Sequence, residues 1–126
     1  MMPQRTITPT HAAAFTPLPD LGFGGIDGSM LWHNLTYSRT SGTGSYLLKM
    51  APGASSALHA HVGAEEFLVL EGELVDFDGQ IFRTGDHVQL GAGSVHTSLS
   101  PAGCRLLVTH WGRTTSARVS EMEPLN

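Results

Sequence analysis

The sequence predicts an all-β domain whose short strands form a sandwich or a barrel. Three observations support this fold class. Charged residues make up 14% of the 126 residues, 15 residues are glycine, and short apolar segments alternate with turn residues along the chain. Glycine-rich turns at close spacing are typical of sandwiches and barrels, and no segment shows the apolar periodicity of an amphipathic helix. A chain of this length suits one domain with a single hydrophobic core.

The expected organisation is an arm, a barrel and a tail. Residues 1–28 are rich in Pro, Thr, Ala and Gly and are expected to form an N-terminal arm. Because proline disrupts regular strand pairing, we expect the first 20 residues to be loosely ordered or docked on a partner subunit. The barrel is expected at residues 29–112, and a polar tail is expected at residues 113–126.

Eight segments are expected as strands, because each is apolar or alternating and is bounded by turn residues. They are residues 32–37, 46–50, 67–70, 74–77, 80–82, 87–90, 95–99 and 105–111. The dipeptide Asp78-Gly79 lies between two of them. Since Asp-Gly tolerates the positive φ angles that a two-residue turn requires, we expect a tight hairpin with these two residues at its tip.

Charge and cysteine content exclude several classes of protein. A formal net charge of -4 and a pI near 5.9 argue against nucleic acid or an anionic membrane as a partner. Cys104 is the single cysteine, so no disulfide can form within the chain, which fits a reducing compartment. No apolar run is long enough for a transmembrane helix, and the first 20 residues lack the apolar core of a secretory signal. We therefore expect a cytoplasmic protein.

Four residues form the strongest functional signal in the chain. His59 and His61 are two residues apart, so they point to the same side of an extended backbone, and Glu65 has the same parity. His96 follows on a later expected strand. Imidazole and carboxylate groups are the usual ligands of zinc, iron, manganese and nickel. We therefore expect His59, His61, Glu65 and His96 to bind one divalent metal ion.

The spacing around these residues resembles the two signature motifs of the cupin superfamily. In the first motif, Gly53 is followed by five residues, the His59-Ala60-His61 triplet, three residues, Glu65, six residues and Gly72. In the second motif, a Gly-Ala-Gly triplet precedes His96 by two residues.

The second motif departs from the usual cupin pattern at two supporting positions. Gly91 stands where cupins usually have proline, and Ser100 stands where they usually have asparagine. Residues 65–74 together with Asp78-Gly79 look most like the small ChrR-like cupins and are similar to the acetylacetone-cleaving dioxygenases. The resemblance implies a double-stranded β-helix, a jelly-roll-like barrel with the metal inside.

The ligand set and the metal leave alternatives open. Glu66 competes with Glu65, but it has the opposite parity, and the six-residue gap to Gly72 also selects Glu65. The ligands do not identify the metal, so Fe²⁺ and Zn²⁺ are the main candidates, followed by Mn²⁺ and Ni²⁺. If the ion is octahedral, four protein ligands leave two positions for substrate or water.

Other residues carry weaker signals. Phe67 and Val69 share the parity of Glu65 and are the best candidates for inward positions, and His110 could reach the mouth of the pocket. Further candidates for the pocket wall are Tyr46, Met50, Phe77, Ser98 and Trp111. Exposed strand edges and the outward Leu68 and Leu70 suggest a homodimer.

Two functions from different classes fit this reading. The first is a metal-dependent, non-heme iron dioxygenase that acts on a small chelating organic substrate. The second is a non-catalytic cupin that binds zinc or senses a ligand. Residues 1–45 contain no amphipathic helical segment that could bind a sigma factor, and residues 22–28 lack the flanking strand and helix of a dinucleotide site. The sequence shows no acid–base set for a sugar isomerase.

Overall fold

The fold was determined from a computed structural model, which describes residues 2–25 and 27–116. These residues form twelve strands and one short 3₁₀ helix, η1, at Thr10–Ala12. The strands are β1 (Thr16–Pro17), β2 (Met30–Asn34), β3 (Thr43–Met50), β4 (Ala54–Ser55), β5 (His59–His61), β6 (Glu65–Asp76), β7 (Ile81–Arg83), β8 (His87–Leu90), β9 (Val95–His96), β10 (Ser98–Ser100), β11 (Cys104–Trp111) and β12 (Thr114–Ser116). Among the described residues, no helix has the length and apolarity needed to cross a membrane.

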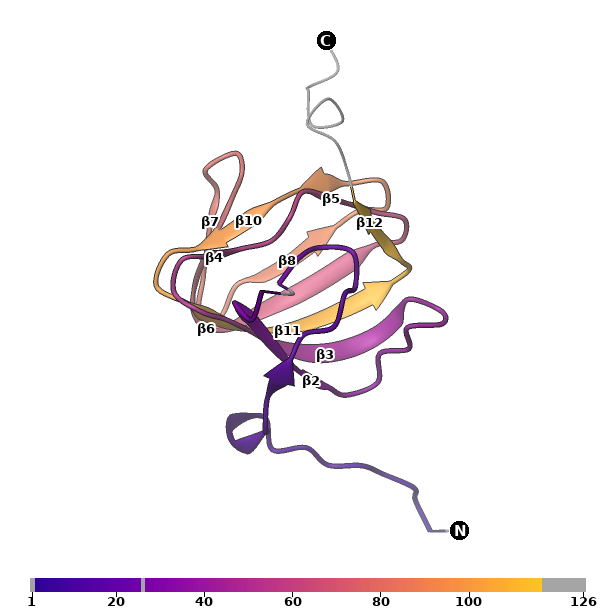
Figure 1. The fold of residues 1–126 in the computed structure, drawn as a ribbon. Helices are drawn as coiled ribbons and strands as arrows, with labels where there is room; N and C mark the ends of the chain where they lie inside the picture. Colours follow the sequence, from indigo (N-terminus) through magenta and orange to yellow (C-terminus); the bar gives the residue numbers. More distant parts are fainter. Residues whose placement is uncertain (1, 26, 117–126) are drawn as a thin grey trace.

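The strands form two antiparallel sheets that enclose one core. The larger sheet has nine strands in the order β1-β2-β3-β11-β6-β10-β4, and β7 and β8 also pair with β6. The smaller sheet has the order β12-β5-β9. Figure 1 shows the large sheet curling, so that β2, β3 and β11 lie on one side of the interior and β4 and β10 on the other, where β5 of the smaller sheet also lies. The predicted all-β, jelly-roll-like barrel is confirmed.

Side chains of three adjacent strands supply the centre of the core. β11 pairs along its whole length with β3 on one side and with β6 on the other. Alternate residues of each strand point inward, because successive side chains in a strand face opposite sides. The inward-facing residues of these strands include the buried apolar residues Tyr46, Leu48, Met50, Phe67, Val69, Leu74, Leu106 and Val108. Each large apolar side chain removed from water contributes about 1.5–3 kcal/mol to stability.

A bulge in β6 reverses which residues face inward. The pairing register with β11 shifts between Arg105, which faces Glu71, and Leu106, which faces Val69. Leu70 is therefore the extra residue of the bulge. Residues at odd positions point inward before the bulge, and residues at even positions do so after it. Gly72 follows with a φ of 79°, and a Cβ there would collide with the Gly103 carbonyl oxygen.

The expected hairpin is present, but its turn differs from the prediction. β6 and β7 pair Leu74 with Phe82 and Val75 with Ile81. Asp76 N–H donates to the Gln80 carbonyl and Gly79 N–H to the Asp76 carbonyl, so three residues, 77–79, form the loop. Only Gly79 has a positive φ, at 87°. The turn is thus a type I turn closed by a glycine bulge, and the predicted two-residue turn and the pairing of Phe77 are wrong.

Of the eight expected strands, only the one at residues 87–90 has the expected bounds, and the two expected at 67–70 and 74–77 are parts of the single strand β6. Two further differences concern β2 and the strand expected at 95–99. β2 ends at Asn34 instead of residue 37, because the Asn34 side chain accepts a hydrogen bond from Tyr37 N–H at 2.8 Å and donates one to the Tyr37 carbonyl at 2.9 Å. These local hydrogen bonds replace the backbone hydrogen bonds between β2 and β3, and they start a turn. The expected strand at 95–99 is split at Thr97, and its two parts, β9 and β10, belong to different sheets.

Segments near both ends of the described chain pack on the barrel, whereas the first residues of the N-terminal segment extend away from it (Figure 1). β1 pairs with β2, and the buried Leu18 and Phe23 join the hydrophobic core of the same chain. This part of the arm is therefore docked on its own barrel and not loosely ordered as expected. β12 pairs with β5, so the expected tail begins with a strand, while residues 117–126 lie outside the described residues.

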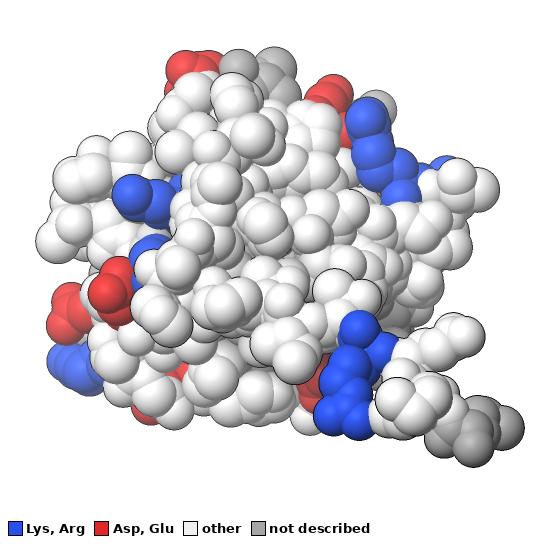
Figure 2. Space-filling view, turned by 90° about the horizontal axis from the view of Figure 1, so that it is seen from below, with Lys and Arg blue, Asp and Glu red and all other residues white. Residues whose placement is uncertain are grey.

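Charged side chains are sparse on the side of the molecule where β2 and the N-terminal segment lie. Figure 2 shows them towards the margins of this face, around an uncharged central area. Few charges would have to be desolvated if another surface covered this area.

Candidate metal centre

The two sheets bring four polar side chains into the apolar interior. His59 and His61 lie at the two ends of the short strand β5 and point inward, with Ala60 between them. His96 on β9 is the direct cross-strand partner of His59. Glu65 is the first residue of β6. All four residues are buried, including Glu65, which is 8% exposed.

A glycine brings Glu65 back beside His61. The connection between β5 and β6 passes so close to the end of β11 that a Cβ on Gly63 would lie 2.6 Å from the Trp111 carbonyl oxygen and from the Gly112 nitrogen. No ordinary side chain fits at this distance. The short, close connection leaves Glu65 Oε2 2.8 Å from His61 Nε2.

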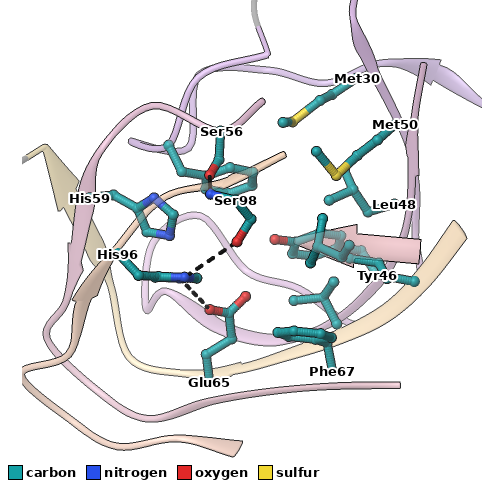
Figure 3. A pocket seen from close by; sticks show the side chains of 14 residues that line it. Met30, Tyr46, Leu48, Met50, Ser56, His59, Glu65, Phe67, His96 and Ser98 are labelled. Carbon is teal, nitrogen blue, oxygen red and sulfur yellow. Dashed lines mark hydrogen bonds and ion pairs between the residues drawn. The ribbon is translucent and has the colours of Figure 1, made fainter. Parts of the chain in front are cut away.

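The four groups converge on one point. One ligand atom from each residue lies within 4.8 Å of the corresponding atoms of the others. His61 Nε2 lies 2.9 Å from His96 Nε2, and His96 Nε2 lies 3.8 Å from Glu65 Oε2. Figure 3 shows His59, His96 and Glu65 at one end of a pocket, directed towards each other.

The donor set fits a divalent transition metal. Ligands bound at about 2.1 Å on adjacent positions of an octahedron lie about 3 Å apart, which agrees with the two shortest separations. Glu65 Oε2 is a buried oxygen with no hydrogen-bond partner among the described residues. An orphaned carboxylate oxygen facing imidazole nitrogens is costly without a cation, because its charge is removed from water.

Two of the histidines are held in place through their second ring nitrogen. His59 Nδ1 lies 2.7 Å from the Ala57 carbonyl oxygen. His96 Nδ1 lies 3.2 Å from Asp76 Oδ1, which also accepts a hydrogen bond from Ser98 Oγ at 3.2 Å. Each Nδ1–H donates to its partner, which leaves Nε2 free to face the centre. Such partners orient the ring and make the ligand more basic.

The protonation states also suit cation binding. Burial lowers the pKa of His59 to about 4, against an opposing hydrogen bond to Ala57. Burial favours the neutral form of Glu65, yet the His61 and His96 rings, whose Nε2 atoms lie 2.8 and 3.8 Å from Oε2, hold its pKa well below the usual range. Burial likewise opposes a charge on His96, but its bonds to Asp76 and Glu65 raise the pKa to about 9. His96 thus carries a positive charge beside the carboxylate, and a bound metal would replace its proton.

A cavity of about 40 Å³ adjoins the four residues. A water needs about 10–15 Å³ measured in this way, so the space admits a ligand of only a few heavy atoms unless side chains move. Most of its wall is apolar, and none of the lysines and arginines in residues 2–25 and 27–116 lines it. The wall consists of Phe23, Met30, Tyr46, Leu48, Met50, Ser56, Phe67, Leu74, Ser98, Leu106 and Val108, besides His59, Glu65 and His96.

A fourth histidine lies beside the cluster. His110 on β11 is buried, and its Nε2 lies 2.7 Å from the Tyr46 hydroxyl oxygen and 3.9 Å from Glu65 Oε1. Its ring stacks on the Tyr46 ring at an interplanar angle of 22°. Burial lowers the pKa of His110, so the ring is neutral.

Residues 3–113 match the family of ChrR cupin-like domains. The chain belongs to this family. The resemblance seen in the two sequence motifs is thereby confirmed for this cupin. The chain has no significant match among curated protein sequences.

Solved structures share the fold at low sequence identity. A candidate acetylacetone dioxygenase from Methylibium petroleiphilum PM1 has a TM-score of 0.75 and 19% identity, covering 100% of this chain and 89% of that chain. The acetylacetone dioxygenase from Acinetobacter johnsonii has a TM-score of 0.71 and 17% identity, covering 99% and 84%. The anti-sigma factor ChrR from Rhodobacter sphaeroides, solved with SigE, has a TM-score of 0.60 and 23% identity, covering 79% and 50%. The fold therefore carries both catalytic and regulatory functions.

The structure brings together the four residues expected to form the metal site of this cupin. Glu66, the competing carboxylate, points away and accepts a hydrogen bond from Trp111 Nε1 at 3.3 Å. The expected wall residues Tyr46, Met50, Phe67 and Ser98 line the cavity, and Val69 is buried in the core. Phe77 and Trp111 do not line it, since their side chains are 50% and 61% exposed.

Sequence reasoning missed two residues near the site. His110 does not lie at the mouth of the pocket but inside, on the same face of β11 as Leu106 and Val108. The even position that His110 shares with Leu106 and Val108 in the sequence could have indicated that it points inward. Asp76 gave no such signal, because the bulge at Leu70 places it on the inward face against the parity of Glu65.

Proposed function

We propose that this cupin is a metal-dependent dioxygenase that acts on a small, chelating organic substrate. The observation that carries the proposal is the buried cluster of three histidines and one glutamate at the end of an apolar cavity. The structural similarity to acetylacetone dioxygenases supports it.

His59, His61, Glu65 and His96 would hold the metal. A bound Fe²⁺ would supply a Lewis acid for two substrate oxygens and a redox partner for O₂. Three neutral imidazoles and one carboxylate leave a divalent ion with one net positive charge, which attracts an enolate or a similar anion.

The cavity wall favours an uncharged or weakly polar substrate body. Phe67 and Met50 line the same cavity as three of the ligands and would exclude water from the substrate oxygens. A phosphorylated substrate would find no lysine or arginine among the described residues of this wall. The substrate class is therefore a small dicarbonyl or diol whose two oxygens can bind one ion.

The test uses the full chain purified without added metal. Metal analysis is followed by separate reconstitution with Fe²⁺ and Zn²⁺, and oxygen uptake is measured with β-diketones and hydroxylated aromatics. We expect uptake by the Fe²⁺ form only. Uptake should disappear in Glu65→Gln and persist in Glu66→Gln, because Glu66 lies outside the site.

A second function, a non-catalytic zinc-binding or ligand-sensing cupin, has its own supporting observation. The matching family is named after ChrR, an anti-sigma factor, although the chain spans only half of that protein. If neither metal form consumes O₂ while one of them binds a chelating ligand tightly, the sensor replaces the dioxygenase. The homodimer and the cytoplasmic location expected from the sequence stay predictions.

A further inference from the structure

The Tyr46 hydroxyl is a polar group on the otherwise apolar side of the cavity. The residue is 1% exposed, and it lines the cavity together with Glu65, His59 and His96. Figure 3 shows its hydroxyl directed across the cavity towards Glu65 and Ser98. Because Met50 and Leu48 form the wall next to it, a ligand that reaches this hydroxyl meets it in an environment without bulk water.

The hydrogen bond between Tyr46 and His110 can carry its proton in two ways. The Tyr46 oxygen and His110 Nε2 are 2.7 Å apart, and His110 Nδ1 is buried without a partner among the described residues. If Tyr46 donates, the neutral ring must carry its own proton on Nδ1, where it has no acceptor. If His110 Nε2–H donates, Nδ1 is an unpaired acceptor, and the phenolic proton is free.

Two observations favour the second arrangement. When a ligand oxygen accepts the phenolic proton, the second arrangement leaves only an unpaired acceptor at His110 Nδ1, whereas the first leaves a buried N–H without an acceptor, which is rarer and more costly. In addition, Glu65 Oε1 lies 3.9 Å from His110 Nε2, so the carboxylate attracts a proton to this nitrogen and not to Nδ1. The Tyr46 oxygen therefore accepts from His110, and its own O–H can point into the cavity.

The hydroxyl of Ser98, which also lines the cavity, already donates its proton to another residue. Ser98 Oγ donates to Asp76 Oδ1 at 3.2 Å, which holds its proton outside the cavity. Tyr46 thus offers a donor to a ligand bound at the candidate metal centre, from the side opposite the histidines.

We propose that Tyr46 is a specificity-determining residue whose hydroxyl donates a hydrogen bond to an oxygen of the ligand, selecting small oxygen chelators of the enolate class. This inference rests on the proposed metal site, but not on the proposed oxygenation. The hydrogen bond would stabilise the negative charge of the bound enolate, and it would be absent for ligands that carry no oxygen.

The test measures ligand binding to the Zn²⁺-loaded full chain, in which no turnover occurs. Calorimetry gives the Kd of acetylacetone and, for comparison, of imidazole, which binds a metal but has no oxygen for Tyr46. We expect Tyr46→Phe to weaken acetylacetone binding by about 10- to 100-fold, the range for a hydrogen bond to a charged group. Imidazole binding and zinc stoichiometry should be unchanged.

Tyr37→Phe is the matched control. Tyr37 packs against both Tyr46 and His110, with ring centroids 5.5 and 5.6 Å away, but it does not line the cavity. It should bind acetylacetone like the wild type. Since Tyr37 and Tyr46 are the only two tyrosines, this variant also isolates the Raman doublet of Tyr46. That doublet should shift towards a donating phenol when acetylacetone binds, which provides a readout even if Tyr46→Phe does not fold.

Each outcome decides the inference. Equal acetylacetone affinity in Tyr46→Phe and the wild type, or an unchanged Raman doublet, overturns it. A parallel loss of imidazole and acetylacetone binding also overturns it, because Tyr46 would then only support the metal site. A wild-type chain that binds no zinc removes the metal site and the inference together. Failure of the Fe²⁺ form to consume O₂, with the Tyr46 effect intact, removes only the dioxygenase.

Discussion

Asp76 Oδ1 lies 3.2 Å from His96 Nδ1. The two residues belong to different strands, because Asp76 is the last residue of β6 and His96 is the last residue of β9. The Asp76 side chain is 10% exposed. Its carboxylate therefore has little competition from water and fixes which nitrogen of His96 faces the centre. A residue outside the ligand set thus decides the orientation of one ligand.

Removal of this carboxylate should weaken metal binding. We expect Asp76→Ala to lower zinc affinity by about 10- to 100-fold, the usual effect of losing an outer partner of a ligating histidine. Asp76→Asn should retain more affinity, because its amide oxygen can still accept from His96. Asp78→Ala is the control, since Asp78 accepts only from Gln80 N–H in the same hairpin. Competition with a chromophoric chelator measures all three, and equal losses in Asp76→Ala and Asp78→Ala would contradict this role.

The two adjacent glutamates should behave differently. Glu65→Gln removes the negative charge that balances the cation, so its loss of metal affinity should exceed the about 10- to 100-fold effect of an outer partner. Glu66→Gln should bind metal like the wild type, because Glu66 contacts Trp111 on the outer face. Equilibrium dialysis with zinc tests the pair. Comparable loss in both variants would show that general charge, and not position, controls binding.

Metal removal should destabilise the folded chain. A metal that binds only the native state, at a free concentration about 1,000 times its Kd, raises the free energy of unfolding by about 4 kcal/mol. Urea unfolding with and without a chelator measures the difference. Glu65→Gln should show little of this metal-dependent difference, and its full retention in that variant would place the stabilising ion elsewhere.

Gly63 should tolerate no side chain. In Gly63→Ala the new Cβ meets the backbone of Trp111 and Gly112 at 2.6 Å, so the β5–β6 connection must shift. We expect a loss of about 1–3 kcal/mol in unfolding free energy and weaker metal binding, because Glu65 moves with the connection. Gly91→Ala is the control: nothing lies within 4 Å of its Cβ position, and we expect a change below about 0.5 kcal/mol. A stable Gly63→Ala with native metal affinity would refute the steric argument.

The local sequence pattern predicted correct strand bounds where the strand pairs regularly with its neighbour. β8 has its expected bounds, because residues 87–90 alternate and pair with the regular part of β6. β2 was predicted too long, since nothing in the apolar pattern shows that the Asn34 side chain bonds to Tyr37. The turn at Gly79 was predicted to have two residues, because Asp-Gly also fits the three-residue turn and the register of the paired strands selects between them.

The sequence by itself determined the all-β class and the four candidate ligands. His59, His61 and Glu65 share one strand parity over a short stretch, and their spacing to Gly72 follows a family pattern. Short-range geometry of this kind is nearly independent of the rest of the chain. The position of His96 opposite His59 completes the set only after β5 and β9 pair.

The tertiary structure alone decided what surrounds these ligands. Asp76 reaches His96 because the bulge at Leu70 reverses the inward face of β6, and a bulge depends on the register with β11. Tyr46 meets His110 because β3 and β11 are paired, although the two residues are 64 positions apart. Contacts at such separation arise from strand pairing and side-chain packing, which local residue patterns do not specify.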